Sequence, residues 1–189
     1  MDYTIAEMKI QDLQEIKNCL DTEYDNFWSY QTLESEINSE SSIYIIIKNN
    51  QNLILGFTGI KVILDEAELM NIVVKKDFRN NGIGSLLLDY LISYSKSINL
   101  KTITLEVNEL NLPAIKLYKK FAFSKLGIRK KYYNGENDAI IMRKNFKQCW
   151  NFFSLNIFFN FNHSSPTTST SRKFLNHKSS LSSNCYNIS

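Results

Sequence analysis

The stretch that decides the fold is DFRNNGIGSLLLDYL, residues Asp77 to Leu91. Two glycines, Gly82 and Gly84, stand before apolar residues at three-and-four spacing, which predicts an amphipathic helix from Gly82. The apolar stripe consists of Ile83, Leu86, Leu87, Tyr90, Leu91, Tyr94 and Ile98. A helix N-terminus carries unpaired N–H groups and a partial positive charge. If the loop before it has no bulky side chains, a phosphate can bind against these N–H groups. The turn is therefore either a phosphate cradle or only a tight bend between a strand and a helix.

Two well-known phosphate-binding patterns do not fit this turn. It is not a Walker A loop, because no Lys-Ser or Lys-Thr pair follows the glycines. It is also a poor dinucleotide fingerprint, because Leu87 stands where that pattern needs a third glycine. Further hydrogen-bond donors are available from Arg79, Asn80 and Asn81, which precede the glycines.

The rest of the chain up to residue 146 predicts a mixed α/β (α+β) fold. Three consecutive strands, the last two joined near Asp65, suggest an antiparallel meander before the glycine turn. A strand, a short helix and a hairpin around Asn134-Gly135 follow the turn. Ser29 and Asn111 are the expected N-caps of two helices. Strands are expected at 3–10, 42–48, 53–64, 66–75, 100–107, 124–133 and 137–144, and helices at 11–20, 29–38, 82–98 and 111–121.

Composition excludes several classes of site from the first 146 residues. Only four of the 22 basic residues and none of the 19 acidic residues lie after residue 146, which leaves this part near neutrality and argues against a nucleic-acid-binding surface. Both histidines, His163 and His177, also lie after it, so proton transfer must use other groups. The three cysteines are scattered, and no metal site is expected.

The chain is expected to consist of one domain, residues 1–146, and a tail, residues 147–189. The tail is rich in Ser, Asn and Phe and is expected to be disordered or loosely packed. The alternatives are an aromatic anchor for a membrane or a partner, and a tail that is not natural coding sequence. No secretory signal and no apolar run of about 18 residues is present, so the expected location is the cytoplasm, with no membrane contact.

Several ordered motifs together resemble one family. An Arg-x-x-Gly-x-Gly turn between an apolar strand and an amphipathic helix resembles the GCN5-related N-acetyltransferases (GNAT). The segment LEVNELNLPAIKLYKKFAF, residues 105–123, is similar to a later segment of that family. The flanking segments VILDEAELMNIVV and IRKKYYNGENDAIIM resemble its bacterial ribosomal-protein-alanine N-acetyltransferases (RimI type). The resemblance covers residues 1–146 and implies the GNAT fold, with a mixed, mostly antiparallel sheet.

The resemblance implies that acetyl-CoA binds at the glycine turn. Backbone N–H groups from Asn81 to Ser85 would hold the pyrophosphate, and Asn111 would contact the CoA arm. The strand before the turn would separate from its neighbour and pair with the pantetheine arm. The implied cofactor-binding residues are Ile72, Val73, Val74, Arg79, Asn80, Asn81, Gly82, Ile83, Gly84, Ser85 and Asn111. Two positions depart from the family: Asn80 is often basic there, and Ala122 is usually glycine.

The resemblance also implies two catalytic residues. Glu106 would be the general base, and Tyr118 would protonate the leaving thiolate. The alternatives are a solvated charge for Glu106 and a core tyrosine for Tyr118. A single carboxylate suits an α-amine, whose deprotonation at pH 7.4 costs roughly 0.5 kcal/mol, better than a lysine, which needs about 4 kcal/mol.

The implied acceptor is the N-terminal α-amine of an alanine in a protein, by resemblance the eighteenth protein of the small ribosomal subunit. Phe27 and Trp28 would line one wall of the acceptor groove, and Tyr132 and Tyr133 the other; each could equally be ordinary packing. Glu136 and Asp138 are expected to be solvated turn charges. Two rival functions are acetylation of a small amine or lysine, and a non-catalytic CoA-binding module.

Overall fold

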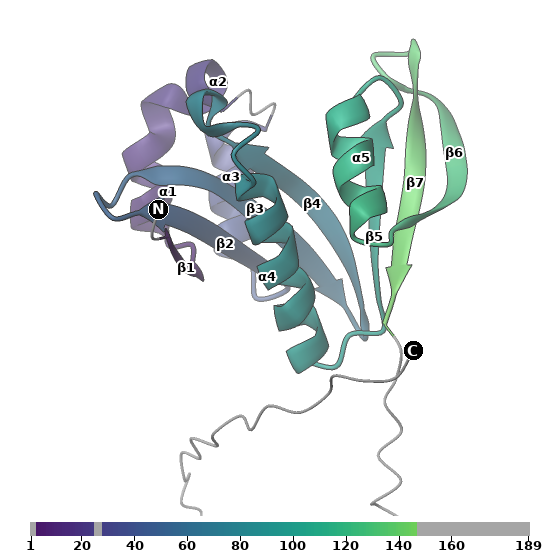
Figure 1. The fold of residues 1–189 in the computed structure, drawn as a ribbon, viewed down its shortest axis with the longest axis horizontal. Helices are drawn as coiled ribbons and strands as arrows, with labels where there is room; N and C mark the ends of the chain where they lie inside the picture. The colour runs from purple at the N-terminus through teal and green to yellow at the C-terminus, as the bar shows by residue number, and fades with distance from the viewer. Residues whose placement is uncertain (1–2, 25–27, 147–189) are drawn as a thin grey trace, which may run out of the picture. The chain divides into compact units, whose positions relative to one another are not determined.

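The computed structural model describes residues 3–24 and 28–146, and the predictions for Phe27 and for segment 147–189 lie outside these residues. Its elements follow the predicted order (Figure 1). The strands are β1 (Tyr3–Glu7), β2 (Ser42–Asn49), β3 (Ile54–Ile63), β4 (Glu66–Val74), β5 (Thr102–Asn108), β6 (Ser124–Tyr133) and β7 (Asn137–Asn145). The helices are α1 (Ile10–Ile16), α2 (Leu20–Glu23), α3 (Tyr30–Ile37), α4 (Ile83–Ser97) and α5 (Leu112–Lys120), with single 3₁₀ turns η1 (Lys17–Cys19) and η2 (Lys76–Phe78).

The strands form one seven-stranded sheet in the order β1-β2-β3-β4-β5-β7-β6. Neighbours are antiparallel except β4 and β5, which are parallel, so the predicted mixed, mostly antiparallel sheet is confirmed. The paired residues of β4 and β5 are Glu66–Glu68 and Thr102–Thr104. Beyond Glu68 the remainder of β4 keeps its pairing with β3, while β5 continues beside β7. The central strands β4 and β5 are therefore paired at one end and separate along the rest of their length.

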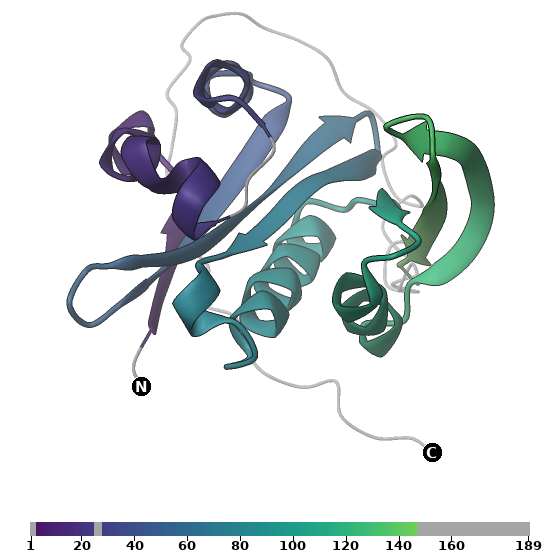
Figure 2. The ribbon, with the colours of Figure 1, turned by 90° about the horizontal axis from the view of Figure 1, so that it is seen from above.

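Each face of the sheet carries its own apolar core. Figure 2 shows α4 and α5 on one side of the sheet and the N-terminal helices on the other. The core on the α4 side includes Leu69, Leu87 and Leu105, whereas the core on the α1–α3 side includes Leu13, Leu33 and Phe57. Burial of these large side chains from both directions holds the sheet in place.

Helix α4 is amphipathic, as predicted, but the predicted apolar stripe was partly wrong. Its buried residues are Ile83, Leu87, Leu88, Leu91, Ile92 and Ser95. Four members of the predicted stripe, Leu86, Tyr90, Tyr94 and Ile98, are between 36% and 40% exposed. The sequence was compatible with two overlapping apolar faces because more than half of the residues of α4 are apolar. Packing against the sheet selected the face centred on Leu87 and Leu91.

Both predicted N-caps form. The Oγ of Ser29 accepts a hydrogen bond from the Thr32 N–H at 3.1 Å, and the Oδ1 of Asn111 accepts one from the Ala114 N–H at 3.2 Å. Each cap satisfies a backbone donor that the first turn of its helix leaves unpaired. The cap on Asn111 fixes the start of α5, the helix that carries Tyr118.

The end of α5 explains how Ala122 replaces the usual glycine. Ala122 adopts a left-handed backbone with φ of 60°, and the Phe123 N–H then bonds the Tyr118 carbonyl at 3.0 Å. Phe123 also packs against the Tyr118 ring, with centroids 5.8 Å apart. The turn that glycine would make is therefore kept, at the steric cost that a Cβ brings to this conformation.

We expect Ala122→Gly to stabilise the protein by about 1 kcal/mol, because glycine adopts this backbone without the Cβ clash. This corresponds to a rise in melting temperature of about 3 °C, measurable by calorimetry. Ala114→Gly, inside the preceding helix α5, is the control and should lower stability, since glycine disfavours a helix. A loss of stability in both variants would contradict the strain at Ala122.

Candidate active site

A cleft of about 950 Å³ opens where β4 and β5 separate. It is lined by residues of both strands, of the α4 N-terminus, of α5, and of the segments around Trp28 and Tyr133. The predicted site residues that line it are Trp28, Ile72, Val73, Val74, Arg79, Asn80, Gly82, Ile83, Gly84, Ser85, Glu106, Asn111, Tyr118, Tyr132 and Tyr133. Asn81 lines a neighbouring hollow instead. The fold thus brings residues that lie far apart in the sequence to one site.

The glycine turn exposes its backbone at the N-terminus of α4. Gly82 is the N-cap in a left-handed conformation with φ of 82°, and no side chain of residues 3–24 or 28–146 caps the helix. Asn80 is also left-handed, with φ of 63°, a conformation that asparagine tolerates better than most residues. A Cβ on Gly84 would meet Leu117 at 3.5 Å, an ordinary contact, so the chain's own packing does not require glycine there. The uncapped N–H groups and slim backbone suit an anion.

Arg79 holds the glycine turn in place through hydrogen bonds to two backbone carbonyls. Its Nε donates to the Val74 carbonyl and one Nη to the Tyr24 carbonyl, both at 3.1 Å. Lys75 forms an ion pair with Glu23 at 2.6 Å. The end of β4 is therefore tied to the end of α2, and the guanidinium predicted to meet a phosphate is engaged in holding the loop.

Glu106 lies on β5 with its carboxylate held by Arg129 of β6. The Nη2–Oε1 distance is 3.1 Å and the Nη1–Oε2 distance is 3.4 Å, so the guanidinium faces both oxygens. The guanidinium also lies over the Tyr132 ring, 4.8 Å from its centroid. The Glu106 side chain is 18% exposed, and its orientation is fixed by a partner two strands away.

Tyr118 approaches the cleft from the opposite face of the sheet. It belongs to the core on the α4 side, and burial raises the pKa of its phenol far above the ordinary value, with the neighbouring Tyr133 adding to the effect. Burial also raises the pKa of Tyr133, to which Tyr132 and the Glu106 charge contribute. Both phenols therefore stay protonated at neutral pH, and Tyr133 lies within the electrostatic reach of both predicted catalytic residues.

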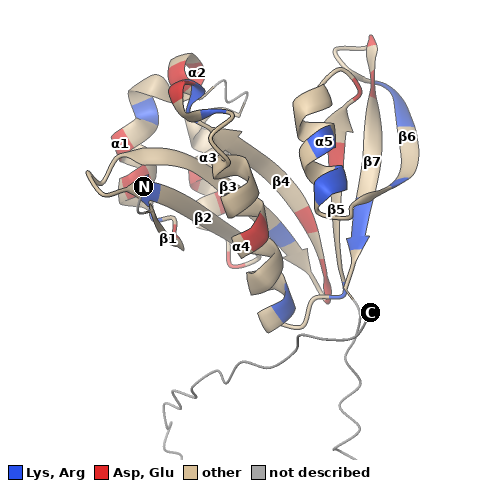
Figure 3. Ribbon diagram, viewed as in Figure 1, with Lys and Arg blue, Asp and Glu red and all other residues tan. Residues whose placement is uncertain are grey.

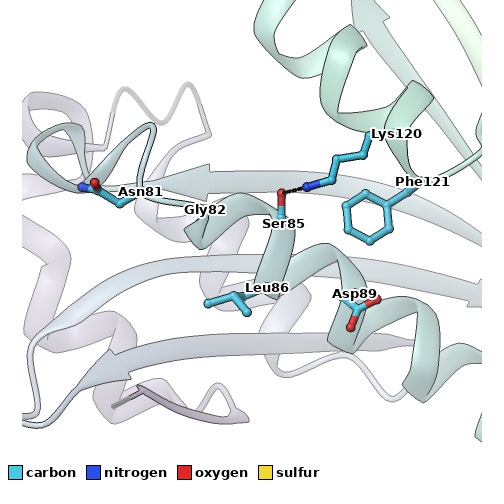
Figure 4. Close-up of a pocket in the computed structure, with 7 residues that line it drawn as sticks. All are labelled: Asn81, Gly82, Ser85, Leu86, Asp89, Lys120 and Phe121. Carbon is cyan, nitrogen blue, oxygen red and sulfur yellow. Dashed lines mark hydrogen bonds between the residues drawn. The ribbon is translucent and has the colours of Figure 1, made fainter. Parts of the chain in front are cut away.

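A second hollow of about 400 Å³ adjoins the cleft between α4 and α5 (Figure 4). It shares Gly82 and Ser85 with the cleft. The ammonium of Lys120 reaches across it to the Ser85 Oγ at 3.4 Å, and Phe121 stands beside them. A cation and an aromatic ring thus lie directly next to the glycine turn.

Several residues of the site could not be found from the sequence. Tyr24, Asn71 and Asn108 line the cleft, and Arg129 binds Glu106. No local pattern marks them, because their positions depend on strand register. The prediction for Asp138 was wrong: it is 8% exposed, and its carboxylate accepts hydrogen bonds from the Lys130 ammonium at 2.6 Å and the Lys131 N–H at 2.9 Å. These bonds lower its pKa, the Lys130 contact most.

Among residues 3–24 and 28–146, no cluster of three or more His, Cys, Asp or Glu side chains could hold a metal ion. No helix in these ranges is long and apolar enough to cross a membrane.

Residues 10–123 match the model of the acetyltransferase (GNAT) family. The chain belongs to this family, as the sequence motifs suggested, and is an acyltransferase. The donor that such acetyltransferases use is acetyl-CoA.

Two bacterial proteins and one solved structure of the family are similar to this chain. The ribosomal protein bS18-alanine N-acetyltransferase of Haemophilus influenzae is 38% identical over 122 residues, 61% of this chain and 80% of that protein. The protein of the same name from Escherichia coli strain K12 is 37% identical over 119 residues, 61% of this chain and 78% of that protein. The crystal structure of the E. coli ribosomal-protein-S18-alanine N-acetyltransferase superimposes with a TM-score of 0.70 at 32% identity, over 76% of this chain and 94% of that one.

A more distant solved structure shares the fold alone. Arabidopsis thaliana NAA60 in complex with acetyl-CoA superimposes with a TM-score of 0.65 at 18% identity, over 76% of this chain and 98% of that one.

Proposed function

We propose that this chain transfers the acetyl group of acetyl-CoA to the N-terminal α-amine of an alanine, in the small-subunit ribosomal protein bS18. The observation that carries the proposal is the meeting of Glu106, Tyr118 and the glycine turn in one cleft. The names of the relatives at 37–38% identity support the choice of acceptor. Acetylation of a ribosomal protein places the reaction in the cytoplasm, where ribosomes are made.

The residues of the glycine turn fit a pyrophosphate. The N–H groups from Asn81 to Ser85 would bind it, because the first turn of α4 has no side-chain cap and Gly84 leaves room for a ligand. Val73 and its neighbours at the end of β4 line the cleft beyond the part paired with β5, and would pair with the pantetheine arm. Lys120 in the adjoining hollow supplies a further cation for the nucleotide end.

The transfer removes two protons from the acceptor nitrogen and gives one to the sulfur, and the two candidate residues stand on opposite faces of the sheet. Glu106 would accept the first proton from the α-ammonium, so that the amine nitrogen can attack the acetyl carbon. As the carbon–sulfur bond breaks, Tyr118 would donate its proton to the sulfur, giving the CoA thiol. The second nitrogen proton would leave to solvent as the amide forms, and the Tyr118 phenolate would regain a proton from solvent. Cys19, the free cysteine among the described residues, does not line the cleft, which supports direct transfer without a covalent intermediate.

The acceptor would lie between two aromatic walls. Trp28 stands on one side, and Tyr132 and Tyr133 stand on the other, where their rings pack edge to face at 5.1 Å. Figure 3 shows Lys and Arg gathered on α5, β6 and β7, and Asp and Glu more frequent on the N-terminal helices. The near-neutral charge of residues 1–146 as a whole supports a protein acceptor rather than direct binding to nucleic acid. The proposed chemistry needs no metal, and we propose that residues 1–146 form the catalytic domain.

The test is thiol release from acetyl-CoA by the full-length chain with a panel of acceptors. The panel contains peptides with free N-terminal Ala, Ser or Met, blocked peptides with an internal Lys, and a polyamine. Turnover confined to the Ala peptide is the expected result. Preference for the Lys peptide or the polyamine would overturn the acceptor and leave the CoA site standing, while CoA binding without turnover of any acceptor would favour a non-catalytic module.

We expect Gly84→Ala to raise the KM for acetyl-CoA at least tenfold, because the new methyl group would enter the space assigned to the pyrophosphate. Thermal stability should be unchanged or higher, since the Cβ makes only ordinary protein contacts and alanine favours a helix. Gly127→Ala is the matched control: its Cβ would meet Ile141 at 3.8 Å, away from the cleft. An unchanged KM in Gly84→Ala would show that the pyrophosphate does not bind against Gly84.

A further inference from the structure

The Asn71 side chain is buried at the cleft with no protein partner for its amide. Asn71 is 8% exposed, and neither its Oδ1 nor its Nδ2 has a hydrogen-bond partner among the described residues. Its backbone is held, because the Thr58 hydroxyl donates to the Asn71 carbonyl at 2.8 Å. A buried amide that lacks partners destabilises the free protein, so its presence in a cleft indicates a role with a ligand.

The strand register places Asn71 on the same side of the sheet as Glu106. Side chains alternate along a strand, and Ile72 and Val74 pack into the core on the α4 side while Val73 packs on the other side. Asn71 therefore shares the face of Val73, which is the face of α1–α3. On β5, Leu105 and Val107 pack on the α4 side, so Glu106 points to the face of Asn71.

A bulge in β4 turns Asn71 into this position. Asn71 pairs with Gly59, but the next pair is Leu69 with Ile60, so Met70 is an extra residue. In a regular strand Leu69 and Asn71, which are two residues apart, would point to the same face; the bulge at Met70 lets Leu69 face the core on the α4 side while Asn71 faces the other way. The bulge thus moves one polar group from the core to the amine side of the cleft.

The Tyr44 phenol beside Asn71 is also unpaired. The Tyr44 ring lies against Gly59, where a Cβ would come within 2.4 Å of the ring carbons. Its hydroxyl is buried without a hydrogen-bond partner among the described residues, and burial raises its pKa. A hydrogen-bonding influence of the Asn71 side chain acts in the opposite direction and lowers the Tyr44 pKa, so the two groups lie close together, although their geometry falls short of a full hydrogen bond. A carbonyl, an NH₂ group and a neutral hydroxyl therefore lie together next to the cleft.

We infer that Asn71 binds the first peptide group of the acceptor and so distinguishes a protein N-terminus from other amines. The amide donates one hydrogen bond and accepts another, which matches the C=O and N–H that follow the α-amine in a peptide. A polyamine has no such group, and a lysine side chain carries its amine four methylene groups away from the backbone. This inference rests on the proposed function, and it names the residue that selects the substrate class.

The test pairs enzyme variants with acceptor analogues. Full-length wild type and Asn71→Leu, which removes both polar atoms at similar volume, are assayed with an Ala peptide and with its trans-alkene isostere. The isostere keeps the shape of the first peptide group and removes its C=O and N–H. We expect wild type to prefer the true peptide at least tenfold in kcat/KM, and Asn71→Leu to lose at least tenfold on the peptide and to show no preference. The KM for acetyl-CoA should not change.

Thermal stability separates recognition from a structural role. Asn71→Leu should melt at the same or a higher temperature, because the Asn71 amide has no hydrogen-bond partner among the described residues that the change would remove. The matched control is Thr102→Val, which removes another buried and unpaired polar atom that does not line the cleft. It should keep the wild-type preference for the peptide over the isostere.

The outcomes distinguish this inference from the proposed function. If wild type acetylates other amines but no Ala peptide, the proposed function fails and the inference fails with it. If wild type acetylates the Ala peptide and Asn71→Leu keeps the preference for it over the isostere, the inference alone is overturned. A clear fall in the melting temperature of Asn71→Leu would also overturn it, because Asn71 would then be serving the fold.

Discussion

Glu106→Gln should lower kcat/KM for an N-terminal Ala peptide about 100- to 1,000-fold, the range expected when a general base is removed. The change keeps the shape of the side chain and replaces the carboxylate with a neutral amide that cannot take a proton. Arg129 can still donate to the remaining carbonyl oxygen, so the local structure should survive. Affinity for acetyl-CoA should stay within about threefold, because the groups proposed to bind it lie at the α4 turn and β4.

The pH dependence tests the role assigned to Glu106. An N-terminal α-amine has a pKa of about 7.8, so solvent supplies the neutral amine as the pH rises. The deficit of Glu106→Gln should therefore narrow between about pH 7 and pH 9. Glu68→Gln is a control, since this carboxylate lines the same cleft from β4. Equal losses in both variants would point to the charge of the cleft and not to a base at Glu106.

Tyr118→Phe should lower kcat by about 10- to 100-fold with little change in the KM for acetyl-CoA. The leaving thiolate would have to take its proton from water. Burial raises the pKa of the phenol above its ordinary value, so the group enters the step protonated, and donation depends on the negative charge that develops on the sulfur beside it. Stopped-flow measurement of thiol release under saturating acetyl-CoA checks the prediction directly.

Stability and a second tyrosine serve as controls for Tyr118. The Phe123 contact and the buried ring persist in phenylalanine, so the melting temperature should change by only a few degrees. Tyr94→Phe removes a hydroxyl from the exposed side of α4, outside the cleft, and should leave kcat unchanged. If Tyr118→Phe turns over at the wild-type rate, another group or water protonates the thiolate.

Local features of the fold were readable because they depend on neighbours in the sequence. The glycine turn before α4, the caps at Ser29 and Asn111, and the turn at Asn134-Gly135 each use contacts within a few residues. Their side chains and backbone preferences act before any tertiary contact forms. The order of strands and helices follows from these signals and from apolar periodicity.

Predictions that depended on burial were less secure. Asp138 was expected in solvent because it follows a turn, yet the two β6 contacts with Lys130 and Lys131 bury it. The buried face of α4 was predicted only in part for a similar reason. More than half of the residues of α4 are apolar, so the sequence of the helix does not show which side packs on the sheet. In both cases the answer lies in elements distant in the chain.

By itself, the sequence determined the glycine turn, the order of elements and the absence of histidine from residues 1–146, and its resemblance to the family suggested Glu106 and Tyr118 as proton carriers. Only the tertiary structure placed Arg129 against Glu106 and turned Asn71 into the cleft. Arg129 reaches Glu106 because the sheet order β5-β7-β6 puts their strands two apart, and Asn71 changes face because β4 carries one extra residue. Strand order and register are long-range properties, set by packing over the whole sheet, so no short stretch of sequence contains them.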